Sequence, residues 1–480
     1  MFFSALFTLT AQDIHPDKVI ENLAIQLEVY PQEKIHLHTD RDVYAAGEKI
    51  MFKAYLVDAH THLYPTYSRY VYVELITPDD SVVNRVMVRP MDDLFYGHLP
   101  LSANIPEGNY TLRAYTRYLE NQGDDWFFKK NIRIVSKGIN PLVKSNEDDY
   151  DVSFFPEGGN LPEGVFCKVA LKALNSDGSP VHLSGEIVDD AGVVITSVQT
   201  VYAGMGVFTF IPEAGKRYRL RCRAENGREK QFELPQPHPR ACTLNITSKN
   251  NRLFATVQKA DSAPEKGHFL FVHCRGHALY FSEWNEANET IVFDENSLPA
   301  GVLQFVLFDE QMNPLSERLV FSKNYDNVTV DFRTDKPSYM IRDKVVSMLS
   351  FVDSDGNIPL TGHLSVAITD DRDIAVDEST TILSSLLLSS ELKGYIANPA
   401  YYLQDNPVSD AALDLLMMTH GWRRYNIPEV VKGNPAYPQI PYQTGQELSG
   451  QVKSLTSSRI VANSEASVMT SHGFLGLTST

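Results

Sequence analysis

The chain repeats part of itself, and this repeat limits what it can fold into. The segment 39–58 recurs as 334–353, and each copy opens with Thr, Asp and a basic residue. Tyr44 in the first copy stands over Tyr339 in the second, and Lys49 stands over Lys344. Self-similarity over such a distance means that two modules share one backbone plan. The chain is therefore expected to be an array of similar units.

A shorter signature occurs three times, at Pro106, Pro212 and Pro299. In each copy a proline is followed within three residues by a glycine and then by alternating apolar residues. Proline fixes φ and glycine permits positive φ, so the pair favours a turn, and the alternation predicts a half-buried strand after it. The copies lie roughly 100 residues apart, which is the size of one β-sandwich domain.

Length and composition agree with several folded units. The 480 residues are 43% hydrophobic and 21% charged, which is enough apolar material for several cores. The formal net charge of −17 disfavours a nucleic-acid partner, because binding phosphates requires clustered Lys and Arg, and the sequence has no such cluster.

Short apolar strands separated by turn residues predict a mainly β fold of tandem, immunoglobulin-like antiparallel β-sandwiches with a few short helices. Helical patterns cover 382–392 and 410–420, where Ser409 is a candidate N-cap and Gly421 a candidate end. The predicted units are a signal remnant (1–12), a leading helix (13–31), four sandwiches (32–137, 150–240, 241–327, and 328–430 with helical insertions) and an incomplete sandwich (446–480).

The apolar run Met1–Ala11 is typical of the rear part of a secretory signal, although no basic residues precede it. A buried N-terminal strand is the alternative. No later apolar stretch reaches the roughly 18 residues that a membrane-spanning helix needs, so no membrane span is expected in this chain.

The four cysteines, Cys167, Cys222, Cys242 and Cys274, are too few and too scattered for a disulfide scaffold, and none forms a CxxC pair. Buried thiols are expected. A bridge between Cys222 and Cys242 stays open as an alternative in an oxidising compartment.

Two histidine pairs have i, i+2 spacing, His36 with His38 and His60 with His62. This spacing could offer two imidazoles to one metal ion. No carboxylate or cysteine lies at zinc-like spacing, so we expect no metal site, and strand alternation is expected to place such pairs on a solvent-facing side.

Three further patterns in the sequence are candidate sites. Glu157, before Gly158 and Gly159, is a candidate acid, but no second carboxylate or nucleophile is placed near it by the sequence. The run 370–373 resembles half of a calcium loop without its glycine and bidentate glutamate, so a solvated turn is expected. Tyr64, Tyr67, Tyr70 and Tyr72 could bind a carbohydrate or a protein, or Tyr70 and Tyr72 could pair across strands. No catalytic, cofactor-binding or metal-binding residue is assigned.

The stretch 34–55, with Thr39-Asp40-Arg41, Tyr44 and Ala46-Gly47-Glu48, resembles the opening of macroglobulin-type domains in the alpha-macroglobulin superfamily. With 414–425 and the segment from Leu448, the layout is similar to large exported proteins of Bacteroidetes-type bacteria. There, such domains precede a carboxypeptidase-regulatory-like sandwich and sometimes a TonB-dependent receptor plug. The resemblance implies that 32–137 and 328–430 are macroglobulin-like and that 446–480 begins a carboxypeptidase-regulatory-like domain.

The functional expectation follows from this resemblance and from the repeated sandwiches. It is a non-enzymatic scaffold, exported to the periplasm, outer membrane or cell surface, which binds protein partners through edge strands and inter-module grooves and needs no cofactor. One alternative is the extracytoplasmic part of a TonB-dependent uptake system. Another is a macroglobulin-like protease inhibitor without a thioester, because the chain has no Cys-Gly-Glu-Gln stretch and no obvious bait segment.

Overall fold

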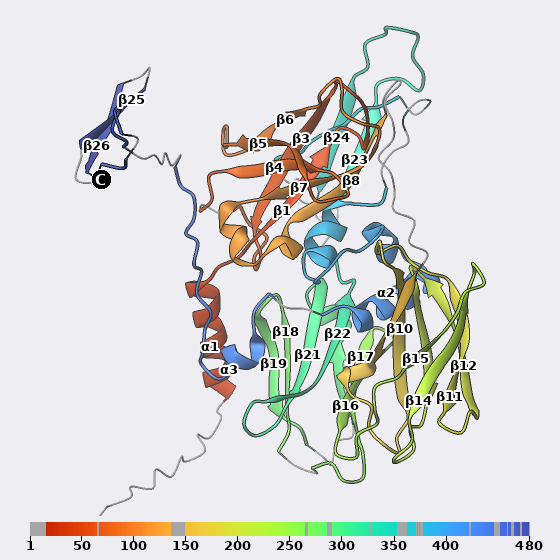
Figure 1. The fold of residues 1–480 in the computed structure, drawn as a ribbon. Helices are drawn as coiled ribbons and strands as arrows, with labels where there is room; N and C mark the ends of the chain where they lie inside the picture. The colour runs from red at the N-terminus through yellow and green to blue at the C-terminus, as the bar shows by residue number, and fades with distance from the viewer. Residues whose placement is uncertain are drawn as a thin grey trace, which may run out of the picture.

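The computed structural model shows a chain built mainly from antiparallel sheets with a few helices, which confirms the predicted fold class (Figure 1). The predicted signal remnant 1–12 lies outside the described residues. The structure describes residues 16–64, 67–135, 149–264, 267–285, 290–325, 328–352, 362–370, 372, 374, 378–421, 424–445, 452–457, 459–461, 465–470 and 473–479.

Three modules, spanning 33–135, 150–233 and 242–322, share one arrangement of seven strands in two sheets. The first sheet of each module has three strands, and the second of these along the chain lies in the middle, in the orders β1-β3-β6, β9-β10-β13 and β16-β17-β20. Their bounds are β1 (Glu33–Thr39), β3 (Lys49–Asp58), β6 (Phe95–Pro100), β9 (Tyr150–Pro156), β10 (Cys167–Asn175), β13 (Met205–Phe210), β16 (Cys242–Lys249), β17 (Arg252–Lys259) and β20 (Thr290–Asp294).

The second sheet repeats as well, in the orders β5-β4-β7-β8, β12-β11-β14-β15 and β19-β18-β21-β22. In the first module the short strand β2 (Val43–Ala45) adds to β8 in parallel, and in the second module β12 also pairs with β13 and joins the two sheets. The bounds are β4 (Val71–Ile76), β5 (Val82–Val88), β7 (Gly108–Tyr115), β8 (Phe128–Val135), β11 (Leu183–Asp189), β12 (Val194–Tyr202), β14 (Tyr218–Ala224), β15 (Glu229–Glu233), β18 (Phe269–Cys274), β19 (His277–Glu283), β21 (Gly301–Phe308) and β22 (Pro314–Ser322).

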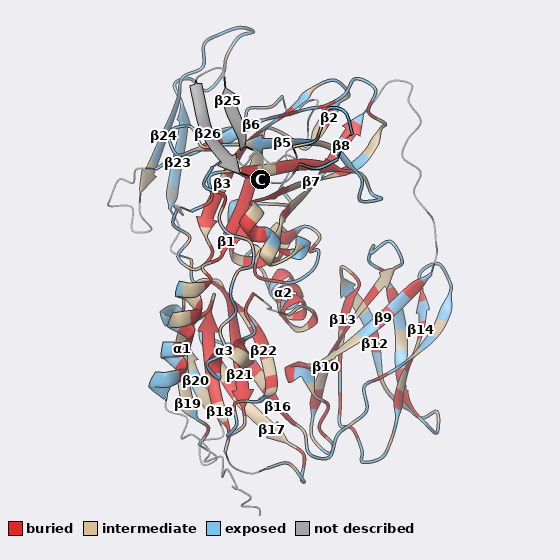
Figure 2. Ribbon diagram, turned by 60° about the vertical axis from the view of Figure 1, so that its left-hand side comes forward, coloured by how far each residue is buried: buried red, intermediate tan, exposed pale blue. Residues whose placement is uncertain are grey.

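The three Pro-Gly signatures lead into β7, β14 and β21, which occupy the same place in their sheets. The predicted strand is therefore confirmed in all three copies, whereas the turn with a positive-φ glycine is absent from the first copy, where Gly108 is already part of β7. Positive φ is used at Gly215 (+72°) and Gly301 (+116°), where only glycine is unstrained. Each module buries its own apolar core between its two sheets (Figure 2), and in the first module Ile35 and Leu37 of β1 belong to that core.

A carboxylate closes the turn after β1. Oδ1 of Asp40 accepts a hydrogen bond from the hydroxyl of Tyr44 at 2.6 Å and another from the backbone N–H of Met51 at 3.0 Å. The guanidinium of Arg41 lies 4.8 Å from the centre of the Tyr44 ring. Asp, Arg and Tyr at this spacing therefore fix the path between β1 and β3.

The second copy of the repeat builds the same turn. Oδ1 of Asp335 accepts from the hydroxyl of Tyr339 at 2.6 Å and from the backbone N–H of Val346 at 3.0 Å. The flanking strands β23 (Thr329–Thr334) and β24 (Ser347–Val352) pair antiparallel, as β1 and β3 do. The repeat seen in the sequence is confirmed as a repeat of backbone structure.

The two tyrosines of the repeat predict unequal effects of one substitution. Tyr44 is buried in the first core, so Tyr44→Phe removes a donor from Asp40 in the interior and is expected to lower the free energy of unfolding by roughly 1–3 kcal/mol. Tyr339 is half-exposed and water can replace its hydroxyl, so Tyr339→Phe should change it by less than about 0.5 kcal/mol. Urea unfolding of both variants checks this, and equal losses would contradict it.

In the described part of 328–430, β23 and β24 are the only strands. The alternating apolar residues of 364–370 predicted a further strand, but these residues form no strand in the structure, because they pair with no other strand there. The extent of the fourth sandwich stays a prediction. The helices and the last hairpin are α1 (Pro16–Val29), η1 (Arg117–Asn121), η2 (Asp124–Trp126), η3 (Glu157–Gly159), η4 (Glu295–Ser297), η5 (Ser384–Ser389, a π-helix), η6 (Pro399–Leu403), α2 (Pro407–Thr419), α3 (Ile427–Val431), and β25 (Glu465–Thr470) with β26 (Gly473–Ser479).

Helix α2 begins earlier than predicted. The side chain of Asn406 accepts from the backbone N–H groups of Val408 (3.2 Å) and Ser409 (3.0 Å), so Asn406 is the N-cap and the prediction of Ser409 was wrong. Pro407 explains the difference, since proline suits the first helical position, where no N–H is needed. His420, one residue before Gly421, ends the helix.

A fourth hydrophobic core lies between the modules and joins them. Helix α2 packs against β9, β10 and β13 of the second module and against β22 of the third. The same core takes apolar side chains from α1, η5 and α3. The modules therefore keep separate cores but are joined side by side through the helices (Figure 2). No helix in the described part of the chain is long and apolar enough to cross a membrane.

Candidate functional site at the junction of the modules

The turn 156–160 of the second module packs against the third module. The carbonyl of Gly158 accepts a hydrogen bond from Ser316 Oγ at 2.7 Å, and Nδ2 of Asn160 donates to the carbonyl of Leu315 at 2.6 Å. Gly158 has φ +71°, and a Cβ on it would lie 2.3 Å from Ser316 Oγ. Contact between the two modules therefore requires glycine at position 158, in addition to its positive φ.

A chain of ion pairs crosses this junction. Arg318 of β22 is 2% exposed, and its Nε donates to Oε1 of Glu157 at 2.9 Å. Its NH2 group donates to Oδ1 of Asp414 on α2. Asp414 Oδ2 also accepts from Nζ of Lys168, on β10, at 2.6 Å. Two modules and one helix are thus held by a single buried guanidinium.

The charges at this junction support one another. Burial alone would lower the pKa of Arg318, but Asp414 and Glu157 together raise it above its ordinary value. Burial alone would raise the pKa of Asp414, but Arg318 and Lys168 hold it below its ordinary value. Arg318 and Asp414 are therefore both charged near neutral pH, and Glu157 and Asp414 are the ion-pair partners of Arg318.

The sequence singled out Glu157 and missed the residues that decide its role. Its second oxygen, Oε2, accepts from Nδ2 of Asn245 at 3.0 Å, so both oxygens have partners. The second carboxylate nearby, Asp414, comes from a helix far along the chain. No spacing rule connects these positions, although the charged Asp414 within an otherwise apolar helical stretch was a usable signal.

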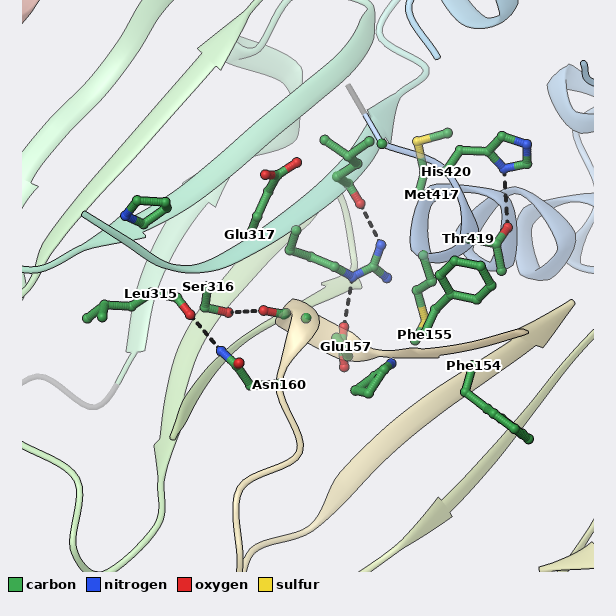
Figure 3. A pocket seen from close by; sticks show the side chains of 18 residues that line it. Phe154, Phe155, Glu157, Asn160, Leu315, Ser316, Glu317, Met417, Thr419 and His420 are labelled. Carbon is green, nitrogen blue, oxygen red and sulfur yellow. Dashed lines mark hydrogen bonds and ion pairs between the residues drawn. The ribbon is translucent and has the colours of Figure 1, made fainter. Parts of the chain in front are cut away.

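An open hollow of about 480 Å³ lies beside the ion pairs (Figure 3). Phe155 and Met417 contribute apolar surface, and Glu157, Ser316 and His420 contribute polar groups. Burial lowers the pKa of His420 to about 3, and its Nε2 lies 3.2 Å from Nζ of Lys172. The imidazole is therefore neutral, and the hollow has both polar and apolar walls.

A second buried junction ties the first module to the helical segment. Nζ of Lys34 on β1 pairs with Glu391, donates to the carbonyl of Leu386 at 2.7 Å and lies 2.9 Å from Nε2 of His62. Burial lowers the pKa of Lys34 to about 7, although Glu391 opposes the shift. Arg424 lies 3.4 Å from the same carboxylate. This contact could not be found by spacing, because its members are far apart in sequence.

The four candidate histidines have different partners. His36 packs edge-to-face on Phe128 with ring centres 5.4 Å apart, and His38 Nδ1 lies 2.5 Å from Ser365 Oγ. His60 contacts the carbonyl of Arg275, whereas His62 contacts Lys34. The expectation of a solvent-facing pair is wrong for His36, which is buried because β1 is covered on both faces. Within the described ranges, no cluster of three or more His, Cys, Asp or Glu is placed to hold a metal ion.

The remaining candidates also have local roles. Arg372 pairs with Asp370 at the surface, while Asp371 and Asp373 lie outside the described residues. Tyr72 stacks on Tyr115 across strands β4 and β7, with ring centres 5.4 Å apart. Tyr70 precedes β4, so its predicted strand pairing with Tyr72 is wrong. The other two candidate tyrosines pack on segments far along the chain, Tyr67 on Tyr442 and Tyr64 on His363.

The cysteines behave as core residues. All four are described, all are buried, and none forms a disulfide. Cys222 lies in the core of the second module and Cys242 in the core of the third, which rules out the bridge left open by the sequence. Burial raises the pKa of Cys167 to about 12, so its thiol stays protonated.

Comparisons with known proteins bear on the first module. Residues 34–129 match the MG2 domain family. No curated protein matches the chain. Solved structures with detectable likeness include alpha-2-macroglobulin from Salmonella reacted with methylamine (14% identity, 66% of this chain, 25% of that chain, TM-score 0.19). Another is alpha-2-macroglobulin from Escherichia coli activated by porcine elastase (13% identity, 67% of this chain, 33% of that chain, TM-score 0.23). A third is dimeric latent PorU from Porphyromonas gingivalis (12% identity, 61% of this chain, 33% of that chain, TM-score 0.25).

The chain covers about a quarter to a third of the length of these structures, and no residue role is carried over from them. The domain match is independent of them and coincides with the module whose opening, 34–55, resembled a macroglobulin-type domain. The first module thus matches the MG2 domain family over residues 34–129.

Proposed function

We propose that this protein is a non-catalytic, exported scaffold that holds sandwich modules in a fixed arrangement and binds protein partners at the periplasmic or outer surface of a bacterial envelope. The proposal includes the Bacteroidetes-type layout, with 446–480 as the start of a carboxypeptidase-regulatory-like domain. The apolar run Met1–Ala11 and the MG2 match at 34–129 support export.

The observation that carries the proposal is the way the junctions are filled. Domains joined by a small polar interface move relative to one another by default. Here Leu413 and Leu416 of α2 are buried in the shared core, and Arg318 and Lys34 form buried ion pairs across the two junctions. These contacts suit a support that presents its surfaces in a constant geometry.

The charged groups at the junction support a non-catalytic role. A general acid needs a carboxyl group whose proton is available to a substrate. Glu157 instead accepts from Arg318 and Asn245, and His420 is a neutral imidazole beside Lys172. In these contacts the polar groups hold the modules in position.

Fractionation of the native host with affinity capture tests the proposal. We expect the protein in the envelope or extracellular fraction, and we expect a defined protein partner to be recovered after cross-linking. A chain whose first 12 residues are deleted is the matched control, and it should stay in the cytosol. Cytosolic location of the intact protein, or capture with no partner, would overturn the proposal.

The same capture separates two rival roles. A TonB-dependent uptake role predicts co-purification with an outer-membrane receptor and a small-molecule ligand. A protease-inhibitor role predicts a stable complex and loss of proteolysis when the chain meets a panel of endopeptidases. For the scaffold we expect neither result.

A further inference from the structure

The hairpin β23–β24 repeats the first two strands of the three-stranded sheet of the first module, and among the described residues it has no third strand. In each complete module the middle strand of the three-stranded sheet is paired on both edges: β3 by β1 and β6, β10 by β9 and β13, β17 by β16 and β20. By the sequence repeat, β24 corresponds to β3. Within the described chain, however, β24 is paired with β23 alone.

The face of this hairpin that corresponds to the first core is exposed. Val330 and Phe332 of β23 stand where Ile35 and Leu37 stand in β1. Ile35 and Leu37 are 3% and 1% exposed, whereas Val330 and Phe332 are 54% and 60% exposed. Leu349 on β24 is also exposed. An apolar surface that is core in one copy of a repeat and open in the other indicates a place for a partner.

One edge of β24 has no strand partner among the described residues, and the backbone groups on that edge lie at defined positions. Val346 points toward β23, because its N–H donates to Asp335 Oδ1 and its carbonyl accepts from the N–H of Asp335, both at 3.0 Å. Backbone groups alternate between the two edges of an antiparallel strand. The N–H and C=O groups of Ser347 and Leu349 therefore face the free edge.

The complete modules show which kind of strand fits there. The strands at the equivalent edge, β6, β13 and β20, each carry phenylalanine, at Phe95, at Phe208 and Phe210, and at Phe293. In β6 the inward residues Phe95 and Leu99 are buried in the core. An antiparallel strand with alternating apolar and aromatic side chains is thus the complement of this edge.

We propose that the edge of β24 is a docking site for an extended segment of a protein partner, which adds as an antiparallel strand and covers Val330, Phe332 and Leu349 with alternate apolar side chains. This rests on the proposed scaffold function and names the site where the partner binds. The segment 364–370 does not occupy the edge, because Ser365 lies against His38 and Tyr55 of the first module and Ile368 is exposed.

A peptide with the sequence of residues 93–101, which contains β6, is the probe. We expect saturable binding of the fluorescent peptide to the whole chain, and slower hydrogen exchange at Ser347 and Leu349 on binding. Ser347→Pro removes an outward N–H without touching the bonds to β23, and Phe332→Asp places a charge on the apolar face. Each should weaken binding at least about tenfold, which corresponds to about 1.4 kcal/mol.

Two controls show that the site is specific. Ile341→Ser changes an exposed apolar residue outside the strands and should leave binding unchanged. A peptide with aspartate in place of Phe95 and Leu99 should not bind. The circular dichroism spectrum of each variant shows that the three complete modules still fold, since the hairpin is not part of their cores.

Four results would overturn the inference. These are no binding of the probe, binding that Ser347→Pro and Phe332→Asp leave unchanged, protection of Ser347 and Leu349 already in the free monomer, and a dimer that Ser347→Pro dissociates. The third would mean that the chain covers its own edge, and the fourth that a second copy does. If a captured partner still binds the Ser347→Pro variant, the site is wrong while the scaffold function stands.

Discussion

Replacing Arg318 with methionine is expected to lower the free energy of unfolding by roughly 3–5 kcal/mol, the usual loss when one member of a buried ion pair is removed. Methionine fills similar space, so the effect comes from charge. Without the guanidinium, Glu157 keeps only its contact with Asn245, and Asp414 keeps only Lys168. Two carboxylates then remain near each other, and one of them, Glu157, is buried. Urea unfolding at pH 7 measures the loss.

Two comparisons test the cause. Arg372→Met removes an exposed arginine that also pairs with an aspartate, and it should cost less than about 0.5 kcal/mol. Adding Glu157→Gln and Asp414→Asn to Arg318→Met should recover much of the stability, because no buried charge is then left alone. If the single variant is as stable as the wild type, or the triple variant is weaker than the single one, the ion-pair account of the junction is incorrect.

The protein is expected to lose stability steeply as the pH falls below about 6.5. Burial lowers the pKa of His36, His62 and His420 to about 3 and that of His273 to about 4, from an ordinary 6.5. The unfolded chain therefore binds protons that the folded chain does not, and this stability is present above pH 6.5 and is lost on acidification. Between pH 7 and pH 5 the loss is about 2 kcal/mol per histidine, or roughly 8 kcal/mol together.

The carboxyl group of Glu33 has the opposite effect on the pH dependence of stability. Burial raises the pKa of Glu33 to about 6, from an ordinary 4.5, in spite of hydrogen bonds from Thr116 and Ser68. Its contribution is present below pH 4.5 and is lost as the pH rises through 6, so between pH 7 and pH 5 it offsets about 1 kcal/mol of the acid effect. The histidines outnumber it, and a net acid loss remains.

Thermal unfolding from pH 8 to pH 5 measures this dependence. His36→Phe removes one buried imidazole while keeping a ring against Phe128, and it should make the melting temperature less sensitive to pH. His98→Gln changes an exposed histidine and should leave the dependence as it is. A melting temperature that does not change over this range would show that the buried imidazoles are already protonated or solvated in the folded protein.

Much of the fold could be read from local patterns. The Pro-Gly signatures ahead of β7, β14 and β21 and the repeat at 39–58 and 334–353 are short-range features, and each specifies a turn whose geometry depends on neighbouring residues alone. Asp40 with Tyr44, and Asp335 with Tyr339, show how five adjacent positions build one turn in both places. Propensity and alternation are sufficient where the partners of a residue are its neighbours.

Most of the candidate site could not be predicted from local sequence patterns. Glu157 was visible as an acid beside two glycines, but its role depends on Arg318 and Asp414, which no periodicity connects to it. His36 was expected at a solvent face, because alternation shows which residues share a side of a strand and cannot show what covers that side. Tyr70 was paired with Tyr72 on residue type, although the strand begins one residue later.

The sequence by itself determined the turns that recur between the modules and the apolar faces that fill their cores, because these depend on interactions between residues close along the chain. Only the tertiary structure decided that α2 and the buried charges of Arg318 and Lys34 join the modules, and that the core-type face of β23 stays uncovered. Both outcomes depend on contacts between residues hundreds of positions apart, whose energies arise from burial in a particular packing and leave no period in the sequence.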